Sequence, residues 1–82
     1  MKIHELKTWP DFFKVIISGE KTFELRKDDR GFRAGDILRL KEWDPSFKRY
    51  TGREISVTAT YVLSGIGLQP NWVAMGIKKV GN

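Results

Sequence analysis

A run of charged residues over positions 19–30, with the sequence GEKTFELRKDDR, is the part of this chain best equipped for chemistry. If the run forms a strand, Thr22, Glu24 and Arg26 share one face. A carboxylate held against a guanidinium makes a fixed array of donors and acceptors, which could read the edge of a base or orient a hydrolytic water. Lys21, at the start of the strand, could reach either face. A solvated edge strand with interspersed charges would show the same pattern, so the residues alone leave both interpretations open.

Other kinds of site find little support in the sequence. The absence of cysteine excludes disulfides, zinc ribbons and thiol catalysis. His4 is the sole histidine and no serine lies in a nucleophile-elbow pattern, so we expect no nucleophilic triad. The adjacent Asp28 and Asp29 supply no ligand spacing for a metal, because neighbouring strand residues point apart. A dinucleotide fingerprint fails at Pro70, where its third glycine would stand. We therefore expect neither a metal nor a cofactor.

Composition narrows the class of protein. The chain has 82 residues, 15 of them lysine or arginine and 10 aspartate or glutamate, with a formal net charge of +5. This length predicts a single domain over residues 1–82. The basic surplus is compatible with nucleic acid or another polyanion as a partner, but mildly basic small domains without such a partner are common. No apolar run is long enough to span a membrane and the start of the chain is polar, so we expect a cytoplasmic monomer without membrane association.

Hydropathy patterns predict five strands and one helix in the order β-α-β-β-β-β. The strands are expected over residues 2–7, 22–28, 37–43, 53–63 and 72–80, and the helix over residues 9–18. The clearest strand has an apolar face made of Ile55, Val57, Ala59, Tyr61 and Leu63. This pattern predicts an α+β, mainly β fold, a compact closed or half-closed barrel whose open end the helix plugs.

The expected helix has signals at both ends and on one face. Thr8, with Asp11 three residues later, is typical of a helix N-cap, and Gly19 is typical of a left-handed C-cap. Apolar residues at the spacing of one buried helix face are Trp9, Phe12, Phe13 and Ile16.

The charged run also carries a family signature. Its G-x-K-x-x-E-x-R pattern is met by Gly19, Lys21, Glu24 and Arg26. With flanking matches along essentially the whole chain, the sequence resembles the ASCH domain family, a relative of the PUA fold. The matching branch, from bacteria and phages, is described as candidate RNA-binding proteins or activating-signal-cointegrator homologues. The resemblance implies a PUA-like five-stranded mixed pseudo-barrel with one short helix. Asp28 departs from the asparagine expected in this branch, which questions any role that needs an uncharged amide there.

The resemblance further implies a cleft beside the signature that binds RNA or a modified nucleotide. The candidate ligand-binding residues are His4, Lys7, Lys21, Thr22, Glu24, Arg26 and Arg30. Aromatic side chains near loops could stack on bases, and these are Trp43, Phe47, Tyr50 and Trp72. For the two tryptophans, and equally for His4, a packed structural role is the competing interpretation.

An enzymatic alternative stays open. Some relatives of similar fold are amidohydrolases on acetylated cytidine, and they use the signature lysine, a threonine in the glutamate column and a distant glutamate. This chain would use Lys21 and Glu24 as catalytic residues, and its downstream acids are Glu42, Asp44 and Glu54. Other relatives are ribonucleases. The alternative is therefore a small hydrolase acting on a modified nucleoside or on RNA, while the cointegrator name alone suggests a protein-interaction adaptor.

Overall fold

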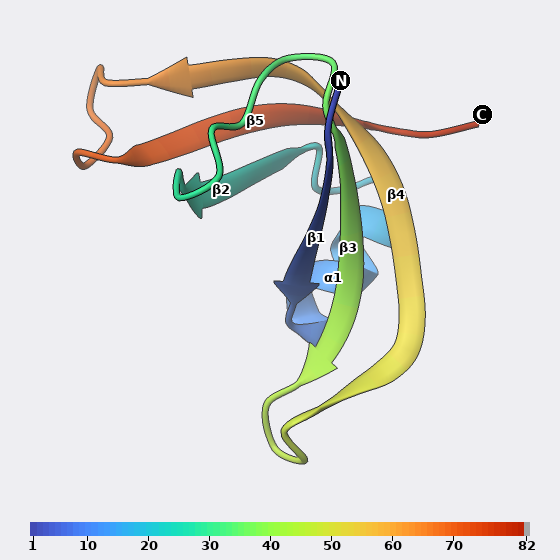
Figure 1. The fold of residues 1–82 in the computed structure, drawn as a ribbon. Helices are drawn as coiled ribbons and strands as arrows, with labels where there is room; N and C mark the ends of the chain where they lie inside the picture. Colours follow the sequence, from blue (N-terminus) through green and yellow to red (C-terminus); the bar gives the residue numbers. More distant parts are fainter. Residues whose placement is uncertain (82) are drawn as a thin grey trace.

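The computed structural model describes residues 1–81, which form five strands and one helix in the expected order (Figure 1). The elements are β1 (Ile3–Thr8), α1 (Pro10–Ile17), β2 (Phe23–Lys27), β3 (Ile37–Asp44), β4 (Arg49–Ser64) and β5 (Trp72–Lys79). The predicted α+β, mainly β class is confirmed. Among the described residues α1 is the longest helix, with 8 residues, and none is long and apolar enough to cross a membrane.

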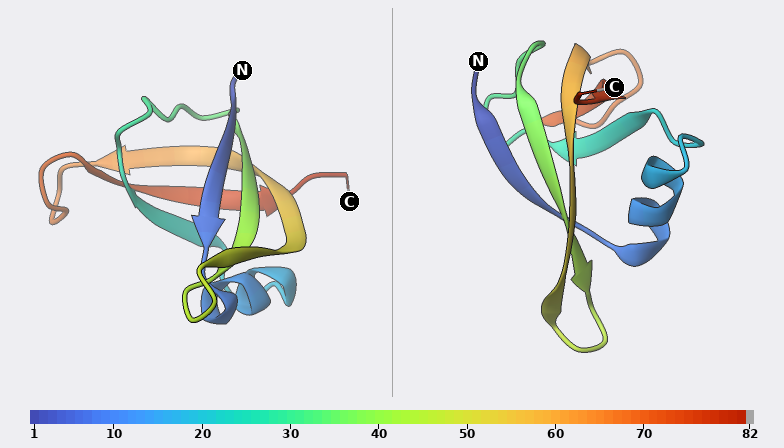
Figure 2. Two further views of the ribbon diagram at one scale, coloured as in Figure 1. Left: turned by 60° about the horizontal axis from the view of Figure 1, so that its bottom comes forward. Right: turned by 90° about the vertical axis from the view of Figure 1, so that its right-hand side faces the viewer.

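All five strands belong to one mixed sheet with the order β1-β3-β4-β5-β2. β1 and β3 are parallel, and the other neighbouring pairs are antiparallel. β4 pairs with β3 through its first part and with β5 through its second, and it bends between the two (Figure 1). This bend curls the sheet into a half-barrel with β1 and β2 at its two edges. β2 and α1 lie on the same side of the layer formed by β1, β3 and the first part of β4 (Figure 2).

The core lies inside this curl. Its buried side chains are Leu6, Ile16, Phe32, Leu38, Leu40, Val57, Ala59, Val73 and Met75. They come from β1, α1, β3, β4, β5 and the link between β2 and β3. In the described part of the chain, β2 adds no apolar side chain to this cluster, and its buried residue is Glu24. The half-barrel is therefore apolar in its centre and charged at the edge that β2 forms.

The helix differs from its prediction at the start. Thr8 is not the N-cap, because it continues β1 with a buried side chain. Trp9 takes the N-cap position in extended backbone and makes no side-chain cap, so α1 begins only at Pro10. Phe13 is buried as predicted, whereas Trp9 is 55% and Phe12 is 52% exposed. Both predictions for buried aromatics are wrong, because the buried residues of α1 are Phe13 and Ile16, and neither Phe12 nor the N-cap residue Trp9 belongs to that buried face.

β4 contains two irregularities that the sequence pattern conceals. Its pairing with β5 shifts between Ala59 and Tyr61, so Tyr61 is 65% exposed instead of lying on the predicted apolar face. Its pairing with β3 shifts opposite Glu42, where residues 51–53 form a bulge around Gly52, whose φ is 95°. The strand therefore begins at Arg49, earlier than the alternation predicts.

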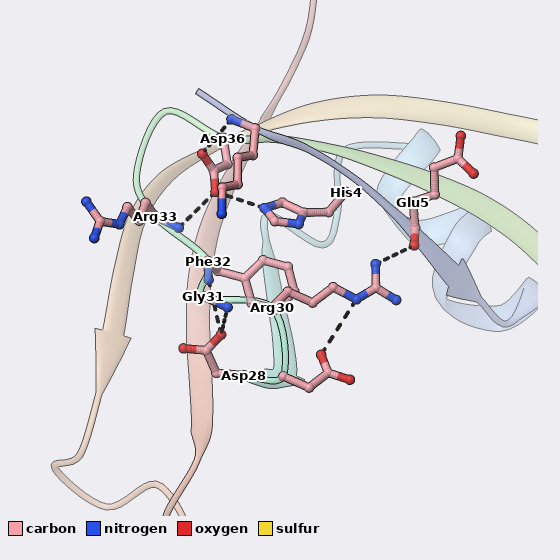
Figure 3. Close-up of polar contacts among 10 residues, drawn as sticks. His4, Glu5, Asp28, Arg30, Gly31, Phe32, Arg33 and Asp36 are labelled. Atoms are coloured by element: carbon pink, nitrogen blue, oxygen red, sulfur yellow. Dashed lines mark hydrogen bonds and ion pairs between the residues drawn. The ribbon is translucent and has the colours of Figure 1, made fainter.

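Two aspartates hold the link between β2 and β3 (Figure 3). Asp28 Oδ1 accepts hydrogen bonds from the backbone N–H groups of Gly31 and Phe32, at 2.9 and 3.1 Å. Asp36 accepts from the backbone N–H groups of Lys2 and Arg33, both at 3.0 Å. The Asp28 side chain therefore acts as an acceptor only, a role that a carboxylate fills without an amide.

Candidate functional site

A groove of about 710 Å³ lies between the end of β1, the start of α1 and the whole of β2. Five of the seven candidate residues line this groove: Lys7, Lys21, Glu24, Arg26 and Arg30. Lys7 comes from β1, Glu24 and Arg26 come from β2, and Lys21 and Arg30 lie in the loops just before and just after β2. β1 and β2 are the two edge strands of the sheet. Curling the sheet brings its edges toward one another, and the groove occupies the space between them. The charged run thus meets residues that are distant from it in the sequence.

β2 turns its charged face inward. The predicted alternation is present, but Glu24 is only 3% exposed while Phe23 and Leu25 are about half exposed. An edge strand with a buried carboxylate is unusual, since burial of a charge costs free energy unless it is paired. The solvated-edge interpretation therefore does not describe Glu24.

Glu24 is paired through both of its carboxylate oxygens. Lys21 Nζ lies 2.9 Å from Oε1, and Arg26 Nε lies 2.9 Å from Oε2. We call Lys21, Glu24 and Arg26 the charged triad. Its side chains are 17%, 4% and 24% exposed, respectively, so the two cations face the groove with only part of their surface in solvent. One carboxylate against two cations leaves the triad with a net positive charge.

Two arginines connect this side of the groove to the edge of β1. Arg26 Nη2 donates to the carbonyl oxygen of Lys7 at 2.6 Å and lies 3.3 Å from Thr8 Oγ1. Arg30 Nη1 donates to the carbonyl oxygen of Glu5 at 2.9 Å (Figure 3). We call these two links the arginine seam. Guanidinium groups thus bind edge carbonyls of β1 in the place where a neighbouring strand would donate backbone N–H groups.

Aromatic side chains form the apolar walls of the groove. Those that line it are Trp9, Phe12, Phe23, Phe32 and Trp72. The Lys21 ammonium lies 5.0 Å from the ring centroid of Phe12 and 5.2 Å from that of Phe23. These are cation–π distances, so the rings add to the packing of the triad.

Of the four predicted stacking residues, one lines the groove. Trp72 lines it, while Trp43, Phe47 and Tyr50 are not among its lining residues. Trp43 packs edge-on against Tyr50, with ring centroids 5.0 Å apart, and the Lys7 ammonium lies 3.9 Å from the Trp43 ring. A structural role for Trp43 is consistent with this packing.

His4 and Thr22, the other two candidates, are not among the lining residues of the groove. His4 is buried, with Nε2 2.9 Å from Asp36 Oδ2 and its ring edge-on to Phe32 at 4.8 Å (Figure 3). The hydrogen bond with His4, followed by those from the Lys2 and Arg33 amides, outweighs burial and lowers the pKa of Asp36 to about 2. Thr22 is exposed, and its carbonyl accepts a hydrogen bond from Ile77 N at 3.0 Å.

The acids considered for a hydrolase also lie elsewhere. Glu42 is buried and accepts from Thr51 Oγ1 at 2.7 Å. Asp44 accepts from Ser46 N at 2.8 Å in the turn after β3, and Glu54 pairs with Arg39 at 3.5 Å. None of these three acids lines the groove. Within residues 1–81, no three His, Cys, Asp or Glu side chains are grouped so that they could hold a metal ion.

Sequence reasoning missed Trp9, Phe12 and Phe23 as groove residues. A usable signal exists in the helix, where six of nine residues from 9 to 17 are aromatic or aliphatic, more than one face of a short helix can bury. A second signal is β2 itself, whose charged face alternates with apolar residues and so must leave one of the two sets exposed.

Residues 3–77 match the sequence model of a family described as "Domain of unknown function (DUF3850)". The chain is also similar to a protein of Escherichia phage P2 described as "Uncharacterized 12.9 kDa protein in GpA 3'region", with 39% identity over 61 residues. Those residues are 74% of this chain and 54% of the phage protein, so the match spans about half the length of that relative. The family match includes every residue that lines the groove.

Proposed function

We infer the function of this chain from its groove, because the chain belongs to the family described as a domain of unknown function (DUF3850) and that description names no activity. We propose that the groove binds RNA by holding one nucleotide, unmodified or modified. We also propose that the chain is related to ASCH domains and to the PUA fold. A cytoplasmic location and a monomeric state are further parts of this proposal.

The observation that carries the proposal is the charged triad set among aromatic walls in a single groove. The lining cations Lys7, Lys21 and Arg30 supply charge for a phosphate, and aromatic rings supply surfaces on which any base can stack. The volume of about 710 Å³ lies within the range of roughly 300–1,000 Å³ found for small-molecule sites. Because the triad is already paired without ligand, its donors are held in place before binding.

The geometry favours binding over hydrolysis. A general base must reach the proton that it removes, and Glu24 is only 3% exposed, with a charged hydrogen bond to each of its oxygens. The acids proposed for the amidohydrolase mechanism lie outside the groove. Product analysis nevertheless belongs in the same experiment, because a cleaved or deacylated product would replace the binding proposal with an enzymatic one.

The test is a titration with the four nucleoside monophosphates and with mixed-sequence RNA hexanucleotides, followed by amide chemical shifts and by mass spectrometry of the products. We expect shifts at Lys21, Glu24 and Arg26 without new products. Arg30→Gln, which removes a groove cation, is expected to weaken binding about tenfold.

Arg49→Gln is the matched control, since it removes the same charge at an exposed residue that does not line the groove. Equal losses in both variants, or shifts that avoid the groove, would contradict the proposal. Nonspecific attraction to the net charge of the protein would then explain the binding.

A further inference from the structure

Two smaller hollows adjoin the groove and share lining residues with it. One has about 320 Å³ and is lined by Leu25, Gly67, Leu68, Gln69 and Trp72. The other has about 390 Å³ and extends over the rest of the loop between β4 and β5. Trp72 lines the groove and both hollows, and Leu25 lines the groove and the first hollow. We call the first hollow the loop subsite. It shares Leu25 and Trp72 with the groove.

The register of the sheet places Trp72 on the same face as Leu25 and Lys27, opposite the face of Glu24 and Arg26, and the groove includes residues of both faces because β2 is an edge strand. Trp72, the first residue of β5, pairs with Lys27, the last residue of β2, so its ring lies where β2 ends and the loop begins. Figure 1 shows the loop between β4 and β5 beyond that end of β2. A chain that passes along β2 through the groove would therefore meet Trp72 and then the loop subsite.

The two compartments differ in their chemistry. Five lysine or arginine side chains line the groove, namely Lys7, Lys21, Arg26, Lys27 and Arg30. The residues that line the loop subsite include no lysine or arginine, and they offer apolar surface from Leu25, Leu68 and Trp72 together with the amide of Gln69. A phosphate suits the first compartment, whereas an uncharged planar group with hydrogen-bonding edges suits the second.

The loop is also held in place before any ligand arrives. Leu68 N donates to the carbonyl oxygen of Gly65 at 3.1 Å, and Trp72 N donates to that of Gln69 at 3.1 Å. Asp28 N donates to the carbonyl oxygen of Asn71 at 2.6 Å, which ties the loop to the end of β2. Such bonds lower the conformational entropy that the loop would lose on binding.

We propose that the loop subsite receives the base of a second nucleotide, with the Trp72 ring between it and the first nucleotide in the groove. This inference rests on the proposed function and deepens it, because it makes the ligand a single strand of at least two nucleotides. The phosphate between the two nucleotides would lie on the side of Lys27, which borders Trp72. Gln69 is assigned to the edge of the second base.

The test compares nucleoside monophosphates with 5′-phosphorylated dinucleotides of the same base, pApA, pUpU, pCpC and pGpG, by calorimetry on the full chain. We expect at least one dinucleotide to bind at least about fivefold more tightly than its monophosphate, the smallest gain typical of one stacked base. We also expect the amide signals of Gly67 and Gln69 to shift with the dinucleotide and not with the monophosphate.

Two variants assign the gain to the loop subsite. Gln69→Ala is expected to reduce the preference for the dinucleotide at least about threefold, with unchanged affinity for the monophosphate. Ile66→Ala is the matched control, because Ile66 lies in the same loop, is 87% exposed and is not among the residues that line any of the three hollows. Ile66→Ala is expected to change neither affinity.

The outcomes separate this inference from the proposed function. If monophosphates bind in the groove and no dinucleotide binds more tightly, the loop subsite is refuted and the groove function stands. If neither ligand shifts groove residues, the proposed function itself fails. A dinucleotide preference that survives Gln69→Ala and falls in Ile66→Ala would also overturn the assignment of the subsite.

Discussion

Glu24 holds the groove together at the scale of single residues. Its carboxylate is almost fully buried, and it neutralises one of the two cations that lie 2.9 Å from its oxygens. A buried carboxylate with two charged donors is costly to disturb, because removing its charge leaves both cations without a counter-charge. Glu24 therefore stabilises the fold, in addition to any contact that it makes with a ligand.

Glu24→Gln is expected to lower the free energy of unfolding by about 2 kcal/mol, the cost of one charged hydrogen-bonding partner. Urea denaturation of the wild type and the variant measures this difference. In a Lys21→Met background the same substitution is expected to cost at least about 0.5 kcal/mol less, since one cation is already absent. Strictly additive effects would show that the ion pair between Lys21 and Glu24 contributes nothing to stability.

The charge of Asp36 also stabilises the folded protein, and this stabilisation depends on pH. Its pKa is about 2 in the folded protein, below the usual 3.8, so the folded state favours the ionised form. As pH falls below 3.8 the unfolded state takes up the proton first. The stabilisation is therefore full above about pH 4 and is lost as pH falls toward 2.

Asp36→Asn is expected to destabilise the protein by about 2 kcal/mol at neutral pH, because the variant lacks the charged acceptor. The difference in unfolding free energy between wild type and variant should shrink as pH falls from 4 to 2, the interval bounded by the two pKa values. Chemical denaturation at several pH values measures it. A difference that stays constant over this interval would mean that the charge of Asp36 contributes nothing.

At the scale of elements, the end of α1 decides where β2 can begin. Gly19 follows the helix with φ of 86°, and its N–H donates to the carbonyl oxygen of Ile16 at 3.1 Å. The prediction of a left-handed glycine at this position is confirmed. Beyond its chain neighbours, an added Cβ would meet no atom within 4 Å, so a substitution there is penalised by backbone strain and not by a clash.

Gly19→Ala is expected to lower the free energy of unfolding by about 1 kcal/mol, the cost of placing a Cβ in the left-handed region. Gly19→Asn should cost less, since asparagine tolerates this region better. Thermal and urea unfolding of both variants measures the effect. Equal stability of alanine and glycine at this position would contradict the strain argument.

Element order and strand alternation could be predicted from the sequence, because both follow from local periodicity. The side of β2 that faces inward could not. Alternation shows that Phe23 and Glu24 point to opposite sides, but which of them is buried depends on the helix and on the edge of β1. The exposure of Tyr61 could not be predicted either, because a bulge shifts the alternation and the residue types at this position do not indicate one.

At the scale of the whole molecule, the sequence identified much of the charged part of the site and little of its apolar part. Lys7 and Arg30 meet the triad because the two edges of a curled sheet approach each other. His4 is on the same strand as Lys7 and close to it in the sequence, yet its side chain pairs with Asp36 and does not line the groove. Nearness in sequence could not separate these two cases, because the difference arises from tertiary contacts.

The proposed binding of RNA in the positively charged groove predicts an affinity that depends on salt concentration. For RNA hexanucleotides, we expect a slope of the logarithm of the association constant against the logarithm of salt concentration of about −2 to −3. Pairing of Lys21 and Arg26 with Glu24 lowers the number of counterions released, so the slope is smaller than five lining cations would give. Fluorescence titrations at several salt concentrations measure it. A slope near zero would show that the phosphates of the RNA do not contact the lining cations.

The arginine seam has a mechanical consequence for the half-barrel. The sheet is continuous from β1 through β3, β4 and β5 to β2, while Arg26 and Arg30 link its two ends by side-chain hydrogen bonds. Side-chain bonds of this kind break and re-form singly, whereas a backbone ladder opens cooperatively. We therefore expect the distance between the two edge strands to change more readily than the spacing of strands joined by backbone ladders. An anion that drew either guanidinium away from its carbonyl would therefore remove one link between the two edge strands and leave the backbone ladders intact.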